Sequence, residues 1–188
     1  MELMGPVDLL FLTAESREHP LHVGTLQLFK PPRGAGRTFV RETYQDMLQR
    51  TEVSPLFSKR PMGFHGAFTN LGWTTDDEVD LSYHLRRDGL PAPGRVRELL
   101  ELTSRLHANL LDRHRPLWEM HVVDGLKDGR FAIYSKMHHA LVDGVSGVAL
   151  MRRSLATDPD AELRTAWQPA PPRARQDRSR PGRLQRLG

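Results

Sequence analysis

Two adjacent histidines, His138 and His139, are the side chains of this sequence best suited to proton transfer. They end an apolar run that begins at Phe131, a pattern typical of a buried strand. Neighbouring side chains on a strand point to opposite faces, so only one of the two histidines can reach a given small site. An imidazole with an ordinary pKa of about 6.5 can act as a general base near neutral pH. We therefore expect one reactive histidine and one that packs behind it.

Asp143 and Gly144 follow the histidines at a spacing that predicts a loop leading into a helix. We expect Asp143 to brace this loop, by pairing with an arginine or by accepting backbone N–H bonds. We expect Gly144 to allow a tight turn where a Cβ would clash. A metal site is the alternative interpretation of the histidine pair. Adjacent histidines on a strand are poor chelators, and no cysteine or spaced carboxylate completes a ligand set, so we expect no metal.

The elements that must position this motif alternate between strand and helix signals. Apolar runs and alternating patterns predict strands over residues 21–29, 79–85, 117–124 and 131–137. Helical spacing of apolar residues predicts helices over residues 38–50, 94–111 and 144–155. The Asp128-Gly129 turn joins the last two strands into a hairpin just before the motif. The predicted fold class is α/β, a mixed sheet with flanking helices.

Apolar spacing also predicts which faces of these elements are buried. For the helix at 38–50, Thr38 is the predicted N-cap, and the buried face is Phe39, Val40, Tyr44, Met47 and Leu48. For the helix at 94–111 the predicted stripe is Val96, Leu99, Leu100, Thr103, Leu106 and Leu110. For the helix at 144–155 it is Val145, Val148, Ala149 and Leu155. Four further histidines have no predicted partner and are interpreted as structural or exposed: His84, His107, His114 and His121.

Composition divides the 188 residues into a folded part, 1–168, and a Pro- and Arg-rich tail, 169–188. The tail has too few large apolar residues to offset its ordering entropy, which predicts a disordered linker. Its arginines account for the net charge of +4, and attraction to anionic lipid is the alternative interpretation. A basic tail on a nearly neutral body argues against a nucleic-acid-binding domain. With neither a signal peptide nor an apolar span near 20 residues, we expect a cytoplasmic protein, soluble or peripheral to a membrane.

The stretch from His138 to Gly144 has the form H-H-x-x-x-D-G. It resembles the active-site motif of CoA-dependent acyltransferases related to chloramphenicol acetyltransferase, which peptide-synthetase condensation domains share. Three other segments resemble the bacterial wax ester synthase/diacylglycerol acyltransferase family in particular: residues 6–12, residues 15–24, and the P-L-W element with its glutamate at 116–119. The resemblance covers residue 1 to about residue 168. Condensation domains match less well at the N-terminus.

The family resemblance implies a chloramphenicol-acetyltransferase-like domain that forms one of the two halves of the family fold, with the C-terminal domain absent. It implies that His139 is the general base, within a motif that includes His138 and Gly144, and that Asp143 is mainly structural. An acyl group would pass directly from acyl-CoA, a substrate rather than a cofactor, to diacylglycerol or a long-chain alcohol. Pro116, Leu117 and Trp118 would shape the acyl or acceptor pocket.

The partners implied are these substrates and either a separately encoded C-terminal half or a second copy of the chain. Contact with the inner membrane or with lipid inclusions is a further expectation, and nucleic acid is not expected. The alternative hypothesis is a non-catalytic remnant or a lipid-associated binding module that keeps the same fold.

Overall fold

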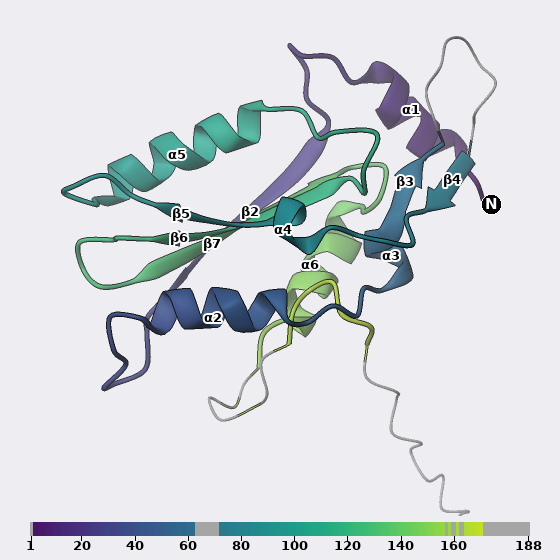
Figure 1. Cartoon of the computed structure of the whole chain (residues 1–188). Coiled ribbons are helices and arrows are strands. Elements are labelled where there is room, and N and C mark those ends of the chain that lie inside the picture. Colours follow the sequence, from purple (N-terminus) through teal and green to yellow (C-terminus); the bar gives the residue numbers. More distant parts are fainter. Residues whose placement is uncertain (1, 63–71, 157, 159–160, 162–163, 171–188) are drawn as a thin grey trace, which may run out of the picture.

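The computed structural model describes residues 2–62, 72–156, 158, 161 and 164–170. Its centre is a four-stranded sheet covered on both faces by helices (Figure 1). Helix α5 (Val96–Ala108) lies on one face, and helices α2 (Phe39–Leu48) and α6 (Gly144–Arg153) lie on the other. This arrangement confirms the predicted mixed α/β class.

The main sheet has the strand order β2-β7-β6-β5. Its strands are β2 (His22–Phe29), β7 (Phe131–His138), β6 (Trp118–Asp124) and β5 (Leu85–Gly89). Strand β7 pairs antiparallel with both β2 and β6, whereas β5 and β6 are parallel. The β6–β7 connection contains Gly129 at a φ of 76°, a conformation that glycine adopts without steric cost. The predicted hairpin before the motif is therefore confirmed.

A small antiparallel sheet of order β1-β4-β3 completes the strands of the described residues. Its strands are β1 (Glu2–Leu3), β4 (Gly72–Thr75) and β3 (Lys59–Pro61). The remaining helices are α1 (Pro6–Ala14), α3 (Pro55–Ser58) and α4 (Leu81–His84). Figure 1 shows α1, β3 and β4 at one end of the main sheet.

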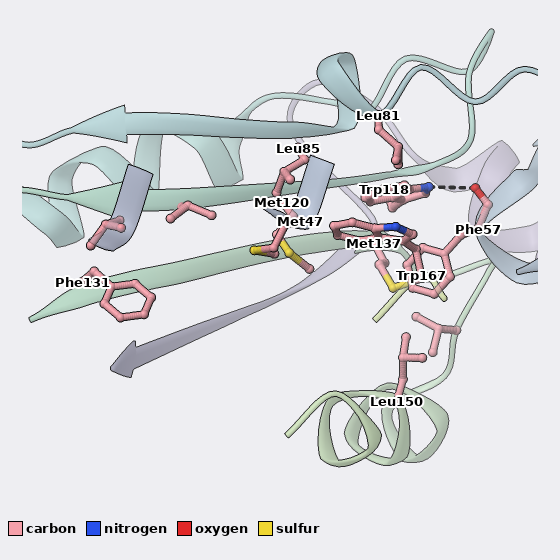
Figure 2. Packing of buried hydrophobic residues seen from close by; sticks show 13 residues of the cluster. Met47, Phe57, Leu81, Leu85, Trp118, Met120, Phe131, Met137, Leu150 and Trp167 are labelled. Carbon is pink, nitrogen blue, oxygen red and sulfur yellow. Dashed lines mark hydrogen bonds between the residues drawn. The ribbon is translucent and has the colours of Figure 1, made fainter. Parts of the chain in front are cut away.

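The two faces of the main sheet are buried against different kinds of side chain. Toward α2 and α6 the face is apolar, and Figure 2 shows Trp118, Met120 and Met137 in one cluster with Leu150 of α6. Trp118 and Met120 are two residues apart on β6, so both side chains lie on this face. The opposite face lies under α5 and buries polar groups, among them Lys136, whose Nζ donates to two carbonyls at the end of α5. Burial on both faces explains why every residue of β6 and β7 is buried or partly buried.

The strand predicted over residues 79–85 is wrong in its first part. Leu81–His84 forms the short helix α4, and the strand begins only at Leu85. The side chain of Asp80 caps α4 by accepting the backbone N–H groups of Ser82 and Tyr83, at 3.0 and 3.2 Å. A side-chain acceptor at an N-cap satisfies donors that an extended chain would offer to a neighbouring strand, and this local bond outweighs the alternating pattern.

The predicted buried face of α6 is also wrong. Val145, Val148 and Leu155 are 82%, 53% and 44% exposed, Ala149 is exposed as well, and Leu150 is the residue that enters the core. The helix is ten residues long, so a single large anchor decides its rotation about its axis. In α5, Leu99 and Thr103 are buried as predicted, but Val96 and Leu100 are about half-exposed. The helix ends at Ala108, so Leu110 lies beyond it and is 41% exposed. Thr38 precedes α2 without making a side-chain capping bond.

The end of the folded part is marked by Trp167, which is fully buried and stacks on Trp118 with ring centroids 5.7 Å apart (Figure 2). Its indole N–H donates to the carbonyl of Arg50. The chain therefore contributes to the core almost as far as the predicted boundary at residue 168. The predicted tail lies outside the described residues from residue 171 onward.

Candidate active site

The paired strands β2 and β7 position the two histidines through their backbones. His138 is opposite His22, the first residue of β2. The backbone N–H of His139 donates to the carbonyl of Leu21 at 2.9 Å, which extends the pairing by one residue. The end of the sheet therefore determines where the motif begins.

His138 is fully buried behind the motif. Its Nδ1 accepts a hydrogen bond from the N–H of Ala140 at 3.0 Å, so the neutral ring carries its proton on Nε2. That Nε2 lies 3.4 Å from Oε1 of Glu15 without a well-aligned hydrogen bond, close enough for electrostatic attraction. Burial lowers the pKa of His138 to about 4, so the ring is neutral at physiological pH. Its contacts are those of a packed, structural histidine.

His139 is half-buried and is held in a different way. Its ring stacks on Phe11 of α1, with centroids 4.0 Å apart and planes inclined by 21°. Within the described part of the chain, its buried Nδ1 has no hydrogen-bond partner. Stacking and the backbone bond to Leu21 therefore orient this imidazole while leaving Nδ1 without a structural bond.

Asp143 is the N-cap of α6. Its Oδ1 accepts the backbone N–H of Ser146 at 2.6 Å, and this bonding lowers the pKa of Asp143. Among the described residues Asp143 pairs with no arginine. Of the two predicted braces, an arginine pair or backbone N–H bonds, the structure therefore shows the backbone bond. Gly144 has an ordinary φ and open space where a Cβ would lie, so the predicted clash is absent. Nothing in the structure explains a glycine there.

Substitution Asp143→Ala should lower the melting temperature by about 2–4 °C, because it removes one helix cap. Asp143→Asn is the matched control, since an asparagine amide oxygen can still accept the Ser146 N–H and should retain most of the stability. Thermal denaturation followed by circular dichroism measures both. If activity fell in Asp143→Ala with no change in melting temperature, a chemical role would replace the structural one.

The predicted pocket residues Pro116, Leu117 and Trp118 are all buried beside the motif. The carbonyl of Leu117 accepts the backbone N–H of His138 at 3.0 Å, so this segment helps to hold the end of β7. Trp118 borders an apolar cavity between the sheet and α6, with a volume of about 70 Å³. Ligand pockets usually have about 300–1,000 Å³, so this cavity by itself is too small for an acyl substrate. Substrate binding by these three residues stays a prediction.

The histidines without predicted partners acquire them from distant elements. The ring nitrogens bond as follows: His84 Nδ1 with the carbonyl of Trp118 at 2.7 Å, His107 Nδ1 with the hydroxyl of Tyr134 at 2.8 Å, and His121 Nδ1 with Asp88 Oδ2 at 2.7 Å. His114 is exposed and contacts Asp112 nearby. Within the described residues no group of three or more histidine, aspartate or glutamate side chains is arranged to hold a metal ion. No described helix is long and apolar enough to cross a membrane.

The buried side chain of Glu15 is part of the site, and the sequence analysis missed it. This side chain is 1% exposed. Oε1 accepts a hydrogen bond from the backbone N–H of Leu21 at 3.1 Å, and Oε2 accepts one from Nη2 of Arg113 at 3.1 Å. Burial opposes ionisation, but these bonds outweigh it and the pKa of Glu15 is lowered. Glu15 and Leu21 both lie in residues 15–24, a segment that resembles the family. This is the one feature of the sequence that could have drawn attention to Glu15.

Because the folded-state pKa of about 4 for His138 lies below its unfolded value near 6.5, the unfolded chain binds a proton that the folded chain excludes. Stability from this group is complete above about pH 6.5 and declines as the pH falls toward 4. In chemical denaturation at a series of pH values, His138→Gln should show a shallower decline than the wild type. The exposed control His114→Gln should keep the wild-type slope, and equal slopes for both variants would contradict the assignment.

Comparisons with known proteins agree with this geometry. Residues 4–188 match the wax ester synthase/diacylglycerol acyltransferase catalytic domain. A protein of Mycobacterium tuberculosis that is provisionally named a diacylglycerol O-acyltransferase is 72% identical over 98% of this chain and 41% of its own length. A second, also provisionally named so, is 58% identical over 93% of this chain and 38% of its own.

Solved structures give the same answer for the fold. The wax ester synthase/diacylglycerol acyltransferase of Marinobacter aquaeolei superposes with a TM-score of 0.83 at 43% identity, over 89% of this chain and 42% of that one. The starter condensation domain of rhizomide synthetase, at 10% identity and a TM-score of 0.55, shares the fold alone. The chain therefore belongs to the wax ester synthase/diacylglycerol acyltransferase family. It spans about two fifths of the length of the relatives that it matches.

Proposed function

We propose that this chain is the part of an acyl-CoA-dependent O-acyltransferase that carries the general base, His139. The observation that supports it most directly is the contrast within the histidine pair. His138 is fully buried with Nδ1 bonded to Ala140, whereas His139 is half-buried with Nδ1 unbonded among the described residues. Family membership gives this contrast its chemical meaning, since the matched family is a catalytic domain.

In this scheme the acceptor is the hydroxyl of diacylglycerol or of a long-chain alcohol. His139 takes the hydroxyl proton while the oxygen attacks the carbonyl of the acyl-CoA thioester. The tetrahedral intermediate collapses with cleavage of the C–S bond, and the imidazolium returns the proton to the departing CoA thiolate. Acyl-CoA is a substrate here, and no step needs a cofactor. These 188 residues contain no cysteine, so the scheme has no acyl thioester on this chain.

Exposed apolar side chains near the motif suggest where the rest of the site would lie. Val7 and Leu10 of α1 are each 62% exposed, and Val145 at the start of α6 is 82% exposed. We propose that these side chains face a second half of the enzyme or a second copy of the chain, or that they contact lipid at a membrane or an inclusion. Cytoplasmic localisation with such peripheral contact is part of the same proposal.

The test uses the 188-residue chain alone and the chain extended to family length with the C-terminal part of the 72% identical relative. Labelled palmitoyl-CoA is supplied with hexadecanol or diolein. The extended protein should form ester without accumulating labelled protein, because transfer is direct. The chain alone should self-associate or bind lipid, without measurable transfer. Lipid binding without turnover in both forms would favour the non-catalytic lipid-binding alternative, and a labelled protein intermediate would contradict direct transfer.

A further inference from the structure

The carboxylate of Glu15 occupies a buried position between helix α1 and the active-site motif. It is the residue that follows the last residue of α1, and its side chain is 1% exposed. Arg113 donates from Nη2 both to Glu15 Oε2 at 3.1 Å and to the carbonyl of Leu12 at 2.7 Å. The charge pair therefore joins the end of α1 to the loop between α5 and β6.

Two short routes lead from this carboxylate to His139. In the first, Glu15 Oε1 accepts the N–H of Leu21 at 3.1 Å, and the carbonyl of Leu21 accepts the N–H of His139 at 2.9 Å. In the second, Oε1 attracts Nε2–H of His138 at 3.4 Å, while Nδ1 of His138 accepts the N–H of Ala140. The backbone of His139 and its two neighbours in the chain, His138 and Ala140, are therefore connected to the carboxylate of Glu15.

Helix α1 also contacts the reactive ring directly. Phe11, one turn before Glu15 along the helix, stacks on the His139 imidazole at 4.0 Å. If the end of α1 moved, the stacked ring and the backbone of His139 would lose their supports together. His22 completes the buried surroundings, because its Nε2 lies 2.6 Å from the carbonyl of His107 and its Nδ1 lies 4.0 Å from Glu15 Oε1.

We propose that Glu15 is a positioning residue for His139, and that it holds the reactive imidazole in place through the Leu21 peptide, through His138 and through helix α1. The role rests on the proposed function, in which His139 is the base. Asp143, by contrast, caps α6 on the other side of the motif. Glu15 does not touch the substrate in this scheme, and its effect on the reaction is exerted only through the placement of His139.

The first experiment compares Glu15→Gln with Glu18→Gln in the chain extended to family length. Both variants replace one carboxylate by an amide in the same short segment, but Glu18 is exposed. Glu15→Gln should lower kcat by about 10–100-fold, the cost of misplacing a catalytic group, and leave KM for palmitoyl-CoA within about twofold. Glu18→Gln should retain wild-type kinetics. Wild-type kcat in folded Glu15→Gln, or an equal loss in both variants, would overturn the proposal.

The second experiment measures backbone amide exchange in the 188-residue chain and needs no turnover. In Glu15→Gln the amides of Leu21 and His139 should exchange about tenfold faster or more, while amides in the middle of β6 should keep their protection. If the wild-type chain extended to family length shows no acyl transfer, the proposed function fails, and amide exchange in the 188-residue chain still decides whether Glu15 holds the motif. Unchanged exchange at both amides would show that it does not.

A third variant covers the case in which Glu15→Gln does not fold. Glu15→Asp keeps the charge for Arg113 but shortens the side chain by one methylene. Its kcat and the exchange rate of its His139 amide should lie between the wild-type values and the values expected for Glu15→Gln. Wild-type values for both would count against the proposal.

Discussion

Replacement of His139 by alanine is expected to lower acyl transfer by about 10²–10⁴-fold, the range for loss of a general base. The ring stacks on Phe11, and among the described residues its buried Nδ1 has no hydrogen-bond partner, so its loss should leave the fold intact. The measurement is kcat for ester formation from palmitoyl-CoA in the chain extended to family length. Circular dichroism on the same samples checks that the structure is retained.

The matched control for this substitution is His114→Ala, which removes an exposed imidazole whose side chain is 81% accessible. Its kcat should equal that of the wild type. If His139→Ala turned over at the wild-type rate, His139 would not be the base. If it lost activity together with its circular dichroism spectrum, the loss would be one of folding.

The largest expected effect on stability is that of Trp118→Ala, at about 3–5 kcal/mol, the usual cost of removing a buried aromatic side chain. Trp118 is 1% exposed and lies between His84, with ring centroids 4.4 Å apart, and Trp167. Its indole N–H donates to the carbonyl of Phe57 at 2.8 Å, as the dashed line in Figure 2 shows. Guanidinium denaturation measures the free energy of unfolding.

Trp118→Phe separates the two contributions of this side chain. A phenyl ring keeps most of the stacking area but leaves the Phe57 carbonyl without its donor, so the loss should be smaller, at about 1–3 kcal/mol. A loss below about 1 kcal/mol in Trp118→Ala would show that Trp118 does not hold this core together. In that case its proposed contribution to a substrate pocket would be its main role.

The sequence by itself was enough for the chemistry-bearing motif and for the strands that carry it. Period-two alternation places Trp118, Met120 and Val122 on one face whatever the rest of the fold, since a strand has no other way to arrange them. The hairpin follows from the Asp128-Gly129 turn for a similarly local reason. The family resemblance rested on short segments whose residues are adjacent in the chain, and the comparisons confirm it.

Some features depended on a balance between local signals that the sequence pattern could not resolve. The segment at 79–85 alternates like a strand, yet the Asp80 cap makes its middle a helix. Helix α6 has apolar residues on several sides, so the position of its anchor, Leu150, in the core decided which side was buried. In the first case a local capping bond decided between two competing patterns, and in the second the contact of Leu150 with the core decided.

The buried polar contacts of the site were decided only by the tertiary structure. Glu15 and Arg113 are 98 residues apart in the chain, and His138 is farther still, yet one carboxylate contacts both. No periodicity connects such residues, because ion pairs and hydrogen bonds depend on distance in space rather than on spacing in sequence. The sequence therefore predicted that one histidine of the pair packs behind the other, as the buried His138 does. Folding decided which side chains surround each of them, because only the packing of α1 against the end of β7 brings those groups within reach.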